Sequence, residues 1–220
     1  GFNTSVANAY PWMAFIAQSN GTYCWLFNAV MIAPNWLAAD NWAYINNQNS
    51  DVTSTVYFYI DDPVKRQIYN ITSIETTAAF DFVFVKLQYI GVGEPLPITP
   101  VPVKCDPITP AQFRMMYWTP SEENNLSRTF TSKQVGLLDS DDCTAACESA
   151  TRTPANYFCP NFKVPTTEIS HYGTPALIAD ASGNLTYIGV VGQLLDTAIL
   201  IQRISSRAAE MQAVTGAVCA

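Results

Sequence analysis

Ser170-His-Tyr-Gly-Thr-Pro-Ala-Leu-Ile178 is the most informative stretch of this chain, because it contains the single histidine, His171. A histidine is the usual base that activates a serine or cysteine nucleophile in hydrolases. Only His171 is available for that role. Ser170 is a poor partner for it, since adjacent residues on one turn rarely point at each other. The stretch therefore argues against a working hydrolase of this kind.

The composition indicates an extracellular, strand-rich protein. The chain has 220 residues, of which 49% are apolar and only 13% are charged, and it is long enough to bury a substantial core. Its net charge of −7, with no basic cluster longer than Lys65-Arg66, argues against nucleic acid as a partner. No run of about 18 apolar residues occurs, so no membrane span is expected. No cofactor is expected either.

Two further features favour secretion. Gly1-Phe-Asn-Thr-Ser5 lacks the basic start and apolar region of a signal peptide, so we expect any such peptide to have been removed. Five Asn-x-Ser/Thr sequons predict N-linked glycans, and they begin at Asn3, Asn20, Asn70, Asn125 and Asn184.

Six cysteines fit an oxidising compartment. They are Cys24, Cys105, Cys143, Cys147, Cys159 and Cys219. The spacing Cys143-x3-Cys147 is compatible with a metal site. With one histidine and no second close pair, however, disulfides are favoured over zinc and no metal is expected.

Short aromatic and β-branched runs, separated by turn residues, predict a sandwich or barrel. The runs are residues 12–17, 29–32, 54–60, 82–87 and 187–191. A helix is predicted over 207–214, with Ser205-Ser206 as its cap and Gly216 as its stop. The proline-rich segment 94–102 is the natural connector between two halves.

In order along the chain, several of these segments resemble the motifs of trypsin-like (chymotrypsin-fold) serine proteases. Residues 170–178 resemble Gly-Asp-Ser-Gly-Gly-Pro-Leu-Val around the nucleophile, and Phe27-Asn-Ala-Val-Met-Ile-Ala-Pro-Asn-Trp36 resembles Cys-Gly-Gly-Ser-Leu-Ile-Ser-Pro-Asn-Trp. Asp81-Phe-Val-Phe-Val-Lys-Leu87 resembles Asp-Ile-Ala-Leu-Leu-Lys-Leu. Weaker matches cover residues 10–16, 116–118, 188–191 and 201–204.

The resemblance implies an all-β fold of two packed antiparallel six-stranded β-barrels with a C-terminal α-helix. The expected halves are residues 1–103 and 104–220. It also implies a disulfide between Cys143 and Cys159. The other four cysteines allow two more intrachain bridges in three connectivities, or bridges between chains, and the sequence leaves these open.

The departures from the family fall on its chemistry. Without a gap, Trp42 stands at the catalytic histidine, Asp81 at the triad aspartate and Tyr172 at the nucleophilic serine. His171 stands at the aspartate that receives the new N-terminus in the family. A gapped alternative places Asp40 at the histidine. Since an indole N–H only donates and a phenol has no base here, the resemblance implies a pseudo-protease and not an enzyme.

Three local questions stay open at this stage. Asp81 either accepts a hydrogen bond from the Trp42 indole or is an ordinary strand-end carboxylate. His171 and Tyr172 either fill the former cleft or form a pH-responsive spot. The aromatic run 56–60 is either a half-buried barrel strand or an exposed contact stripe.

The expected function is therefore binding rather than catalysis. A secreted protease homologue without a triad acts as a decoy, cofactor or inhibitor that binds a protein partner. The alternative is self-association, in which the chain is a structural protomer of an extracellular filament or matrix.

Overall fold

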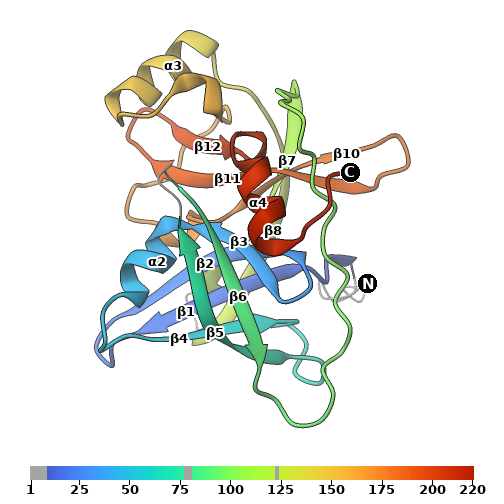
Figure 1. The fold of residues 1–220 in the computed structure, drawn as a ribbon. Coiled ribbons are helices and arrows are strands. Elements are labelled where there is room, and N and C mark those ends of the chain that lie inside the picture. Colours follow the sequence, from blue (N-terminus) through green and yellow to red (C-terminus); the bar gives the residue numbers. More distant parts are fainter. Residues whose placement is uncertain (1–8, 77–80, 122–123) are drawn as a thin grey trace, which may run out of the picture.

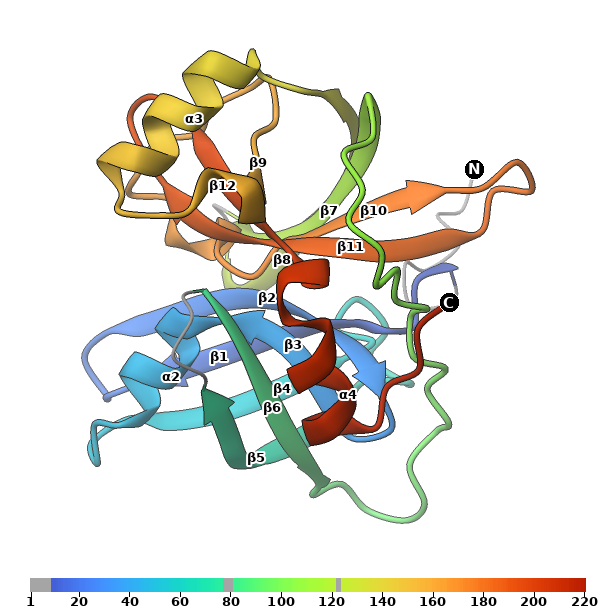
Figure 2. The same ribbon diagram turned by 45° about the horizontal axis from the view of Figure 1, so that its top comes forward.

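The computed structural model describes residues 9–76, 81–121 and 124–220, and it is predominantly β (Figure 1). A first sheet occupies one half of the molecule and a second sheet with helix α3 occupies the other (Figure 2). Within the described residues, three α-helices accompany the sheets, namely α2 (Asn41–Asn47), α3 (Ser140–Ser149) and α4 (Ala208–Thr215).

The first sheet closes into an antiparallel barrel with the order β1-β2-β3-β6-β5-β4. Closure comes from β1, which pairs with both β2 and β4. Alternate residues of a barrel strand face the interior, but much of β1, β2, β3 and β6 is buried on both faces. The strands are β1 (Met13–Ser19), β2 (Cys24–Ala33), β3 (Trp36–Asp40), β4 (Thr53–Phe58), β5 (Gln67–Thr76) and β6 (Phe82–Tyr89).

The second sheet also has six strands, in the order β8-β7-β10-β11-β12-β9, but it is not closed. Its strands are β7 (Gln112–Ser121), β8 (Asn124–Gly136), β9 (Tyr157–Phe158), β10 (Pro175–Ala179), β11 (Leu185–Leu194) and β12 (Ile199–Arg203). The predicted second barrel is therefore confirmed only as a six-stranded sheet.

The opening lies between β8 and β9. Only an isolated bridge between Leu137 and Pro160 joins these two edges. Strand β9 has two residues, and Pro160, which has no N–H, follows closely after it. The bridge is made by two backbone hydrogen bonds, from the Leu138 N–H to the Cys159 carbonyl and from the Asn161 N–H to the Gly136 carbonyl, both at 2.9 Å.

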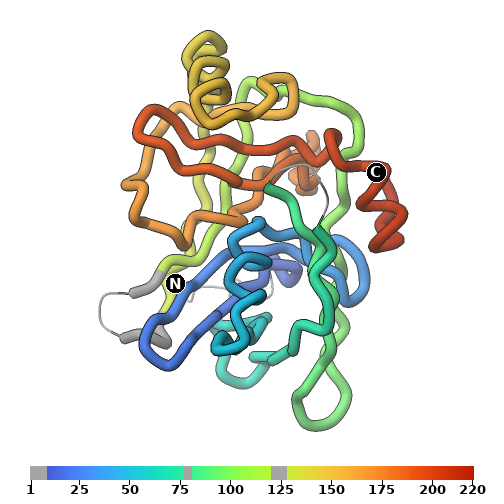
Figure 3. Tube along the Cα trace, turned by 60° about the vertical axis from the view of Figure 1, so that its left-hand side comes forward, coloured from blue at the N-terminus to red at the C-terminus, as the bar shows by residue number. Residues whose placement is uncertain are grey.

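The two halves share one apolar core and are joined by a long irregular connector. Buried residues of both sheets belong to the same cluster, so the halves pack directly on each other. The connector between β6 and β7 contains the proline-rich segment 94–102 and runs along one side of the molecule (Figure 3). The predicted boundary at residue 103 falls within it and stays a prediction.

The expected secondary structure is largely confirmed. All five runs predicted as strands lie in or overlap strands, and α4 ends at Gly216, which adopts φ +72° as a C-cap. The predicted serine cap is wrong, because no side chain caps α4 and Ser205 and Ser206 lie in a 3-10 turn before it. Helix α3, which Asp139 caps through its carboxylate, was not predicted.

Candidate functional site

The first element of the site is the turn from β3 into α2. Asp40 ends the strand, and its Oδ2 accepts a hydrogen bond from the Trp42 N–H at 3.0 Å. This is the usual geometry of an N-cap carboxylate. It places Trp42 in the first turn of α2, where its side chain is 41% exposed.

The second element is Asp81, a buried carboxylate at the start of β6. Arg152 donates to it twice, from Nε to Oδ2 and from Nη2 to Oδ1, both at 3.1 Å. Tyr157 donates to Oδ2 through its hydroxyl, and Gln193 Nε2 donates to Oδ1 at 3.3 Å. Its side chain is only 2% exposed, and that of Arg152 is 13% exposed.

All three donors to Asp81 come from the second half of the chain, so the carboxylate ties the two halves together. We call Asp81, Arg152, Tyr157 and Gln193 the Asp81 clamp. Strand β11 approaches so closely that a Cβ on Gly192 would lie 2.4 Å from the Asp81 carboxyl carbon.

The hypothesis that Trp42 donates to Asp81 is not supported, because the described contacts of the carboxylate do not include the indole. Trp42 instead lies edge-on to Tyr172, with ring centroids 5.9 Å apart. Burial raises the pKa of Tyr172, although hydrogen bonds from the Leu194 backbone and the Trp42 side chain oppose the shift. The phenol is therefore protonated at neutral pH and is no nucleophile.

The three triad-like positions, Trp42, Asp81 and Tyr172, therefore lie close together but do not form a triad. The Trp42 ring contacts Tyr172, and the charge of Asp40 also contributes to the raised pKa of Tyr172. Trp42 and Asp81 line the same cavity. This cavity, which lies beside these positions, has a volume of about 140 Å³, and its lining also includes Ile45 and the Asp81 clamp residues Arg152 and Gln193.

The turn before Tyr172 is closed by its own hydrogen bonds. Residues Ile169–His171 form a 3-10 turn, and the Tyr172 N–H donates to the Ile169 carbonyl at 3.1 Å. In acyl-transfer enzymes of this geometry, the N–H at the nucleophile position must face the developing oxyanion. Here that donor is already occupied within the turn.

His171 is a buried side chain in this same turn. Its Nε2 lies 3.0 Å from Glu168 Oε2, and its ring lies edge-on to Tyr117 at 4.7 Å between centroids. Burial lowers the pKa of His171, although the hydrogen bond and charge of Glu168 oppose the shift. A neutral, packed imidazole fits the interpretation of His171 as a packing residue rather than a pH-responsive one.

A second tie between the halves, which the sequence did not reveal, is made by Asn28. This fully buried side chain on β2 donates to the Trp118 and Ser170 carbonyls at 3.0 and 2.7 Å and accepts from the Trp118 N–H at 2.7 Å. Its backbone N–H donates to the Tyr172 carbonyl at 3.2 Å. A buried amide with all its polar atoms paired fixes the packing of a strand.

Gly173 allows this close approach. It adopts φ +84°, and a Cβ at this position would lie 1.9 Å from the Asn28 carbonyl oxygen. Glycine is required here both by the backbone conformation and by the lack of space.

Asp40 and Tyr187 are buried polar groups behind the site. Burial, together with the charge of Asp81, raises the pKa of Asp40 well above its ordinary value, although hydrogen bonds from Trp42 and Asn41 oppose the shift. Asp40 Oδ1 and the Tyr187 hydroxyl have no hydrogen-bond partner among the described residues. Burial and the charge of Asp40 also raise the pKa of Tyr187. Burial therefore disfavours the charged form of both groups.

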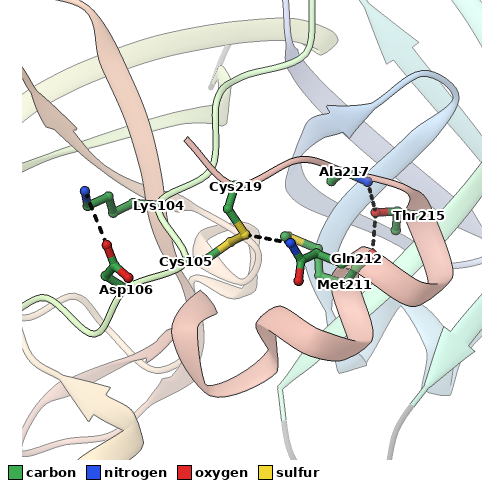
Figure 4. The surroundings of a disulfide bond; sticks show 8 residues. All are labelled: Lys104, Cys105, Asp106, Met211, Gln212, Thr215, Ala217 and Cys219. Carbon is green, nitrogen blue, oxygen red and sulfur yellow. Dashed lines mark hydrogen bonds and ion pairs between the residues drawn. A yellow bond between two sulfur atoms is a disulfide. The ribbon is translucent and has the colours of Figure 1, made fainter.

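The cysteines form two bridges. Cys143 bonds to Cys159, as the resemblance implied, and Cys105 bonds to Cys219 near the C-terminus (Figure 4). Cys24 and Cys147 are free, so the idea of two bridges among the remaining four cysteines is wrong. Cys147 is buried on α3 and Cys24 is exposed at the start of β2 in the other half, which places them too far apart in the fold to pair.

The sequons lie at different kinds of position. Asn20 is in the turn between β1 and β2, Asn70 is exposed on β5, and Asn184 is exposed in the turn between β10 and β11. Asn125 falls in β8 at a position whose side chain is not described, and Asn3 lies outside the described residues. Among the described residues, no group of three metal-ligating side chains occurs.

Comparison with known proteins adds no relative. A scan against protein-family models finds no match, and a search of curated proteins finds none either. The closed antiparallel barrel with a second six-stranded sheet is compatible with a chymotrypsin-like fold. None of the helices in the described part of the chain is long and apolar enough to cross a membrane.

Proposed function

We propose that this protein is a secreted, glycosylated homologue of chymotrypsin-fold proteases that has no peptidase activity and acts by binding a protein partner. The observation that supports the proposal is that the side chains at the triad-like positions are engaged in packing and hydrogen bonds within the chain. Tyr172 is buried against Trp42, its N–H is bonded to Ile169, and Asp81 is bonded to Arg152. Neither Tyr172 nor Asp81 is free to act as a base.

The binding face we favour is the exposed side of α2 beside the filled cleft. Trp42 and Ile45, three residues apart on the helix, are 41% and 47% exposed. Exposed tryptophans surrounded by apolar neighbours often contribute strongly to protein interfaces. Trp42 is also held by its contact with Tyr172, so little side-chain entropy is lost when a partner covers it.

The first test addresses catalysis. A fluorophosphonate probe for serine hydrolases should not label the protein. The double variant Trp42→His, Tyr172→Ser should also stay unlabelled and inactive on peptide substrates, because the closed turn and the Asp81 clamp remain. Labelling of the wild-type protein, or peptidase activity in the double variant, would contradict the proposal.

The second test addresses binding. The native protein and its Trp42→Ala and Ile45→Ser variants are compared in affinity capture from extracellular fluid of the source. Val64→Ser is the matched control, since Val64 is 93% exposed on a different loop. A protein retained by the wild type and by the control, but lost from both α2 variants, supports the proposal. Equal retention by all four proteins argues against this face.

A structural role is the alternative, and one observation favours it. Cys24 is exposed and has no partner within the chain, and an unpaired cysteine in a secreted protein suggests a bridge between chains. Light scattering of the native protein distinguishes the two functions. A single-chain particle supports the binding role, whereas disulfide-linked oligomers that disappear in Cys24→Ser support assembly.

A further inference from the structure

The outer face of the first barrel carries a sequon within its strands. Asn70, the first residue of this sequon, is exposed on β5, where alternate residues face outward. Its cross-strand partners are Thr55 on β4 and Gln88 on β6. The Asn70 side chain therefore lies on the outer face of the barrel, between these two strands.

The surface differs on the two sides of Asn70. On the β6 side, Lys86 and Gln88 are exposed polar side chains. On the β4 side, Thr55 and Tyr57 line a groove of about 700 Å³. A substituent on the Asn70 amide therefore meets a polar surface in one direction and a hollow in the other.

The strand register leads from Asn70 directly into this groove. Thr55, opposite Asn70, is also opposite Ala17 on β1. Ala17 in turn is opposite Leu26 on β2. Ala17 and Leu26 are half-buried and line the groove. Since neighbouring strands are about 4.8 Å apart, Ala17 lies roughly 10 Å from Asn70.

The part of this face nearest to Asn70 also offers apolar surface. Ile68, two residues before Asn70, faces the same side and is 36% exposed. It pairs with Tyr57, which is half-buried on the outer face of β4. Tyr57 is thus a diagonal cross-strand neighbour of Asn70, a separation of about 7–8 Å that an aromatic side chain can reach across.

The position of Tyr57 also answers the question of the aromatic run 56–60. Val56 and Phe58 are buried inside the barrel, as the barrel-strand interpretation predicted, whereas Tyr57 faces outward. The run therefore belongs to a half-buried barrel strand that presents one aromatic ring on the outer face.

These features fit the first sugars of an N-linked glycan. The ring faces and the acetyl methyl group of N-acetylglucosamine are apolar and can lie on Ile68 and Tyr57, while its hydroxyl and amide groups can bond to the Thr55 hydroxyl. Because the glycan is tethered at Asn70, its effective concentration at the groove is high, and weak contacts are sufficient to hold it there.

We propose that an N-linked glycan on Asn70 lies across β4, with its first two N-acetylglucosamine rings on Ile68 and Tyr57 and in the groove at Thr55 and Ala17. This docking rests on the proposed function, since it requires a secreted and glycosylated chain. It covers the outer barrel face with the protein's own glycan and leaves the exposed side of α2 to a protein partner.

Cleavage of the native glycoprotein by an endoglycosidase tests the docking, because the enzyme must reach the first two sugars. The full chain is secreted from cultured eukaryotic cells, and mass spectrometry follows glycan release at Asn70 and at Asn184. Asn184 is exposed in the β10–β11 turn, which projects from the second sheet (Figure 2). We expect release at Asn70 to be at least tenfold slower than at Asn184 in the native protein, and the two rates to become similar after denaturation.

Substitutions locate the contact. We expect Tyr57→Ser and Ile68→Ser each to accelerate release at Asn70 at least fivefold and to leave release at Asn184 unchanged. Val218→Ser is the matched control, because Val218 is an 81% exposed apolar residue near the C-terminus, and it should change neither rate. Thermal unfolding establishes that each variant is folded, and the exposed Ile68 keeps the test valid if Tyr57→Ser unfolds.

Several results would refute the docking. An Asn70 peptide without a glycan, in a protein that is glycosylated at Asn184, would overturn the docking alone. A secreted protein with no glycan would overturn the glycosylated state as well, whereas the peptidase and capture tests above would still decide the rest of the proposed function. Unchanged release at Asn70 in folded Tyr57→Ser and Ile68→Ser would show that the glycan does not lie on these side chains. Equal acceleration in Val218→Ser would indicate a general loosening and not a contact.

Discussion

Replacing Asp81 by Asn is the sharpest test of the Asp81 clamp. Asp81 adopts φ +79°, a region that Asn and Asp enter more readily than other side chains. Asn therefore preserves the backbone and the side-chain shape and removes the negative charge. The Arg152 guanidinium, which is 13% exposed, then faces an amide that can accept from only one of its two donors.

The expected cost follows from the burial of the pair. Removing one partner of a buried ion pair typically costs about 3–5 kcal/mol, because the other charge is left without compensation. Since Arg152 retains some exposure and also donates to the Ala150 carbonyl, we expect the lower end, about 3 kcal/mol. This is a large share of the roughly 5–15 kcal/mol that stabilises a typical domain.

Urea unfolding followed by tryptophan fluorescence measures the effect, with Arg152→Met and the double variant completing a cycle. We expect the double variant to cost clearly less than the sum of the two single variants, with a coupling energy of about 2–3 kcal/mol. Asp106→Asn is the control. Asp106 is 81% exposed and lies 3.6 Å from Lys104 (Figure 4), and such surface pairs contribute about 0–1 kcal/mol. A cost below about 1 kcal/mol for Asp81→Asn, or additive single effects, would refute the clamp.

Three further predictions concern glycine, a titrating carboxyl group and a disulfide. Gly173→Ala should prevent folding or lower the unfolding free energy by more than about 4 kcal/mol. Gly21→Ala is the control, because Gly21 has φ +88° but nothing lies within 4 Å of its Cβ position, so the loss should be only about 1–2 kcal/mol. Equal losses in thermal unfolding would contradict the close approach of Gly173 to Asn28. The pKa of Asp40 is raised in the folded chain, so the native state binds more protons above about pH 4. The wild-type protein then loses stability as the pH rises through the folded pKa of Asp40. The unfolding free energy of Asp40→Asn, measured in urea, should therefore rise relative to that of the wild type over the same pH range. A difference between the two proteins that does not change with pH would show that Asp40 does not titrate in this way. Cys105 and Cys219 are 114 residues apart, so replacing both by Ser should lower the unfolding free energy by about 4–5 kcal/mol. A loss under about 1 kcal/mol in urea unfolding would show that the bridge does not constrain the unfolded chain.

Local patterns in the sequence were sufficient to predict most of the fold. Short apolar runs predicted five strands because the period of a strand depends only on neighbouring residues. Gly216 predicted the end of α4 because a left-handed C-cap favours glycine. Helix α3 was missed although Asp139 and the acidic residues after it are a typical helix start. That signal was present and was not used.

The contacts that define the site could not be predicted in the same way. Arg152 lies 71 residues from Asp81 in the sequence, and Asn28 lies 142 residues from Ser170. Nothing local to either residue indicates its partner. The order of the family-like motifs was sufficient to bring Trp42 near Tyr172, because it specifies which strands and turns meet. It could not say that Asp81 would bind an arginine, since this partner lies outside the motifs.

The hydrogen bonds of Asp81 also explain why a histidine at position 42 would not form a triad with it. A carboxylate has about four acceptor positions. Oδ1 accepts from Arg152 and Gln193, and Oδ2 accepts from Arg152 and Tyr157, so all four are occupied. In a Ser-His-Asp triad the carboxylate must accept from the imidazole and hold it in the correct tautomer. A histidine at position 42 would have to displace a donor of the clamp and leave a buried group unpaired. The same contacts that tie the two halves together therefore oppose a Ser-His-Asp triad built on Asp81.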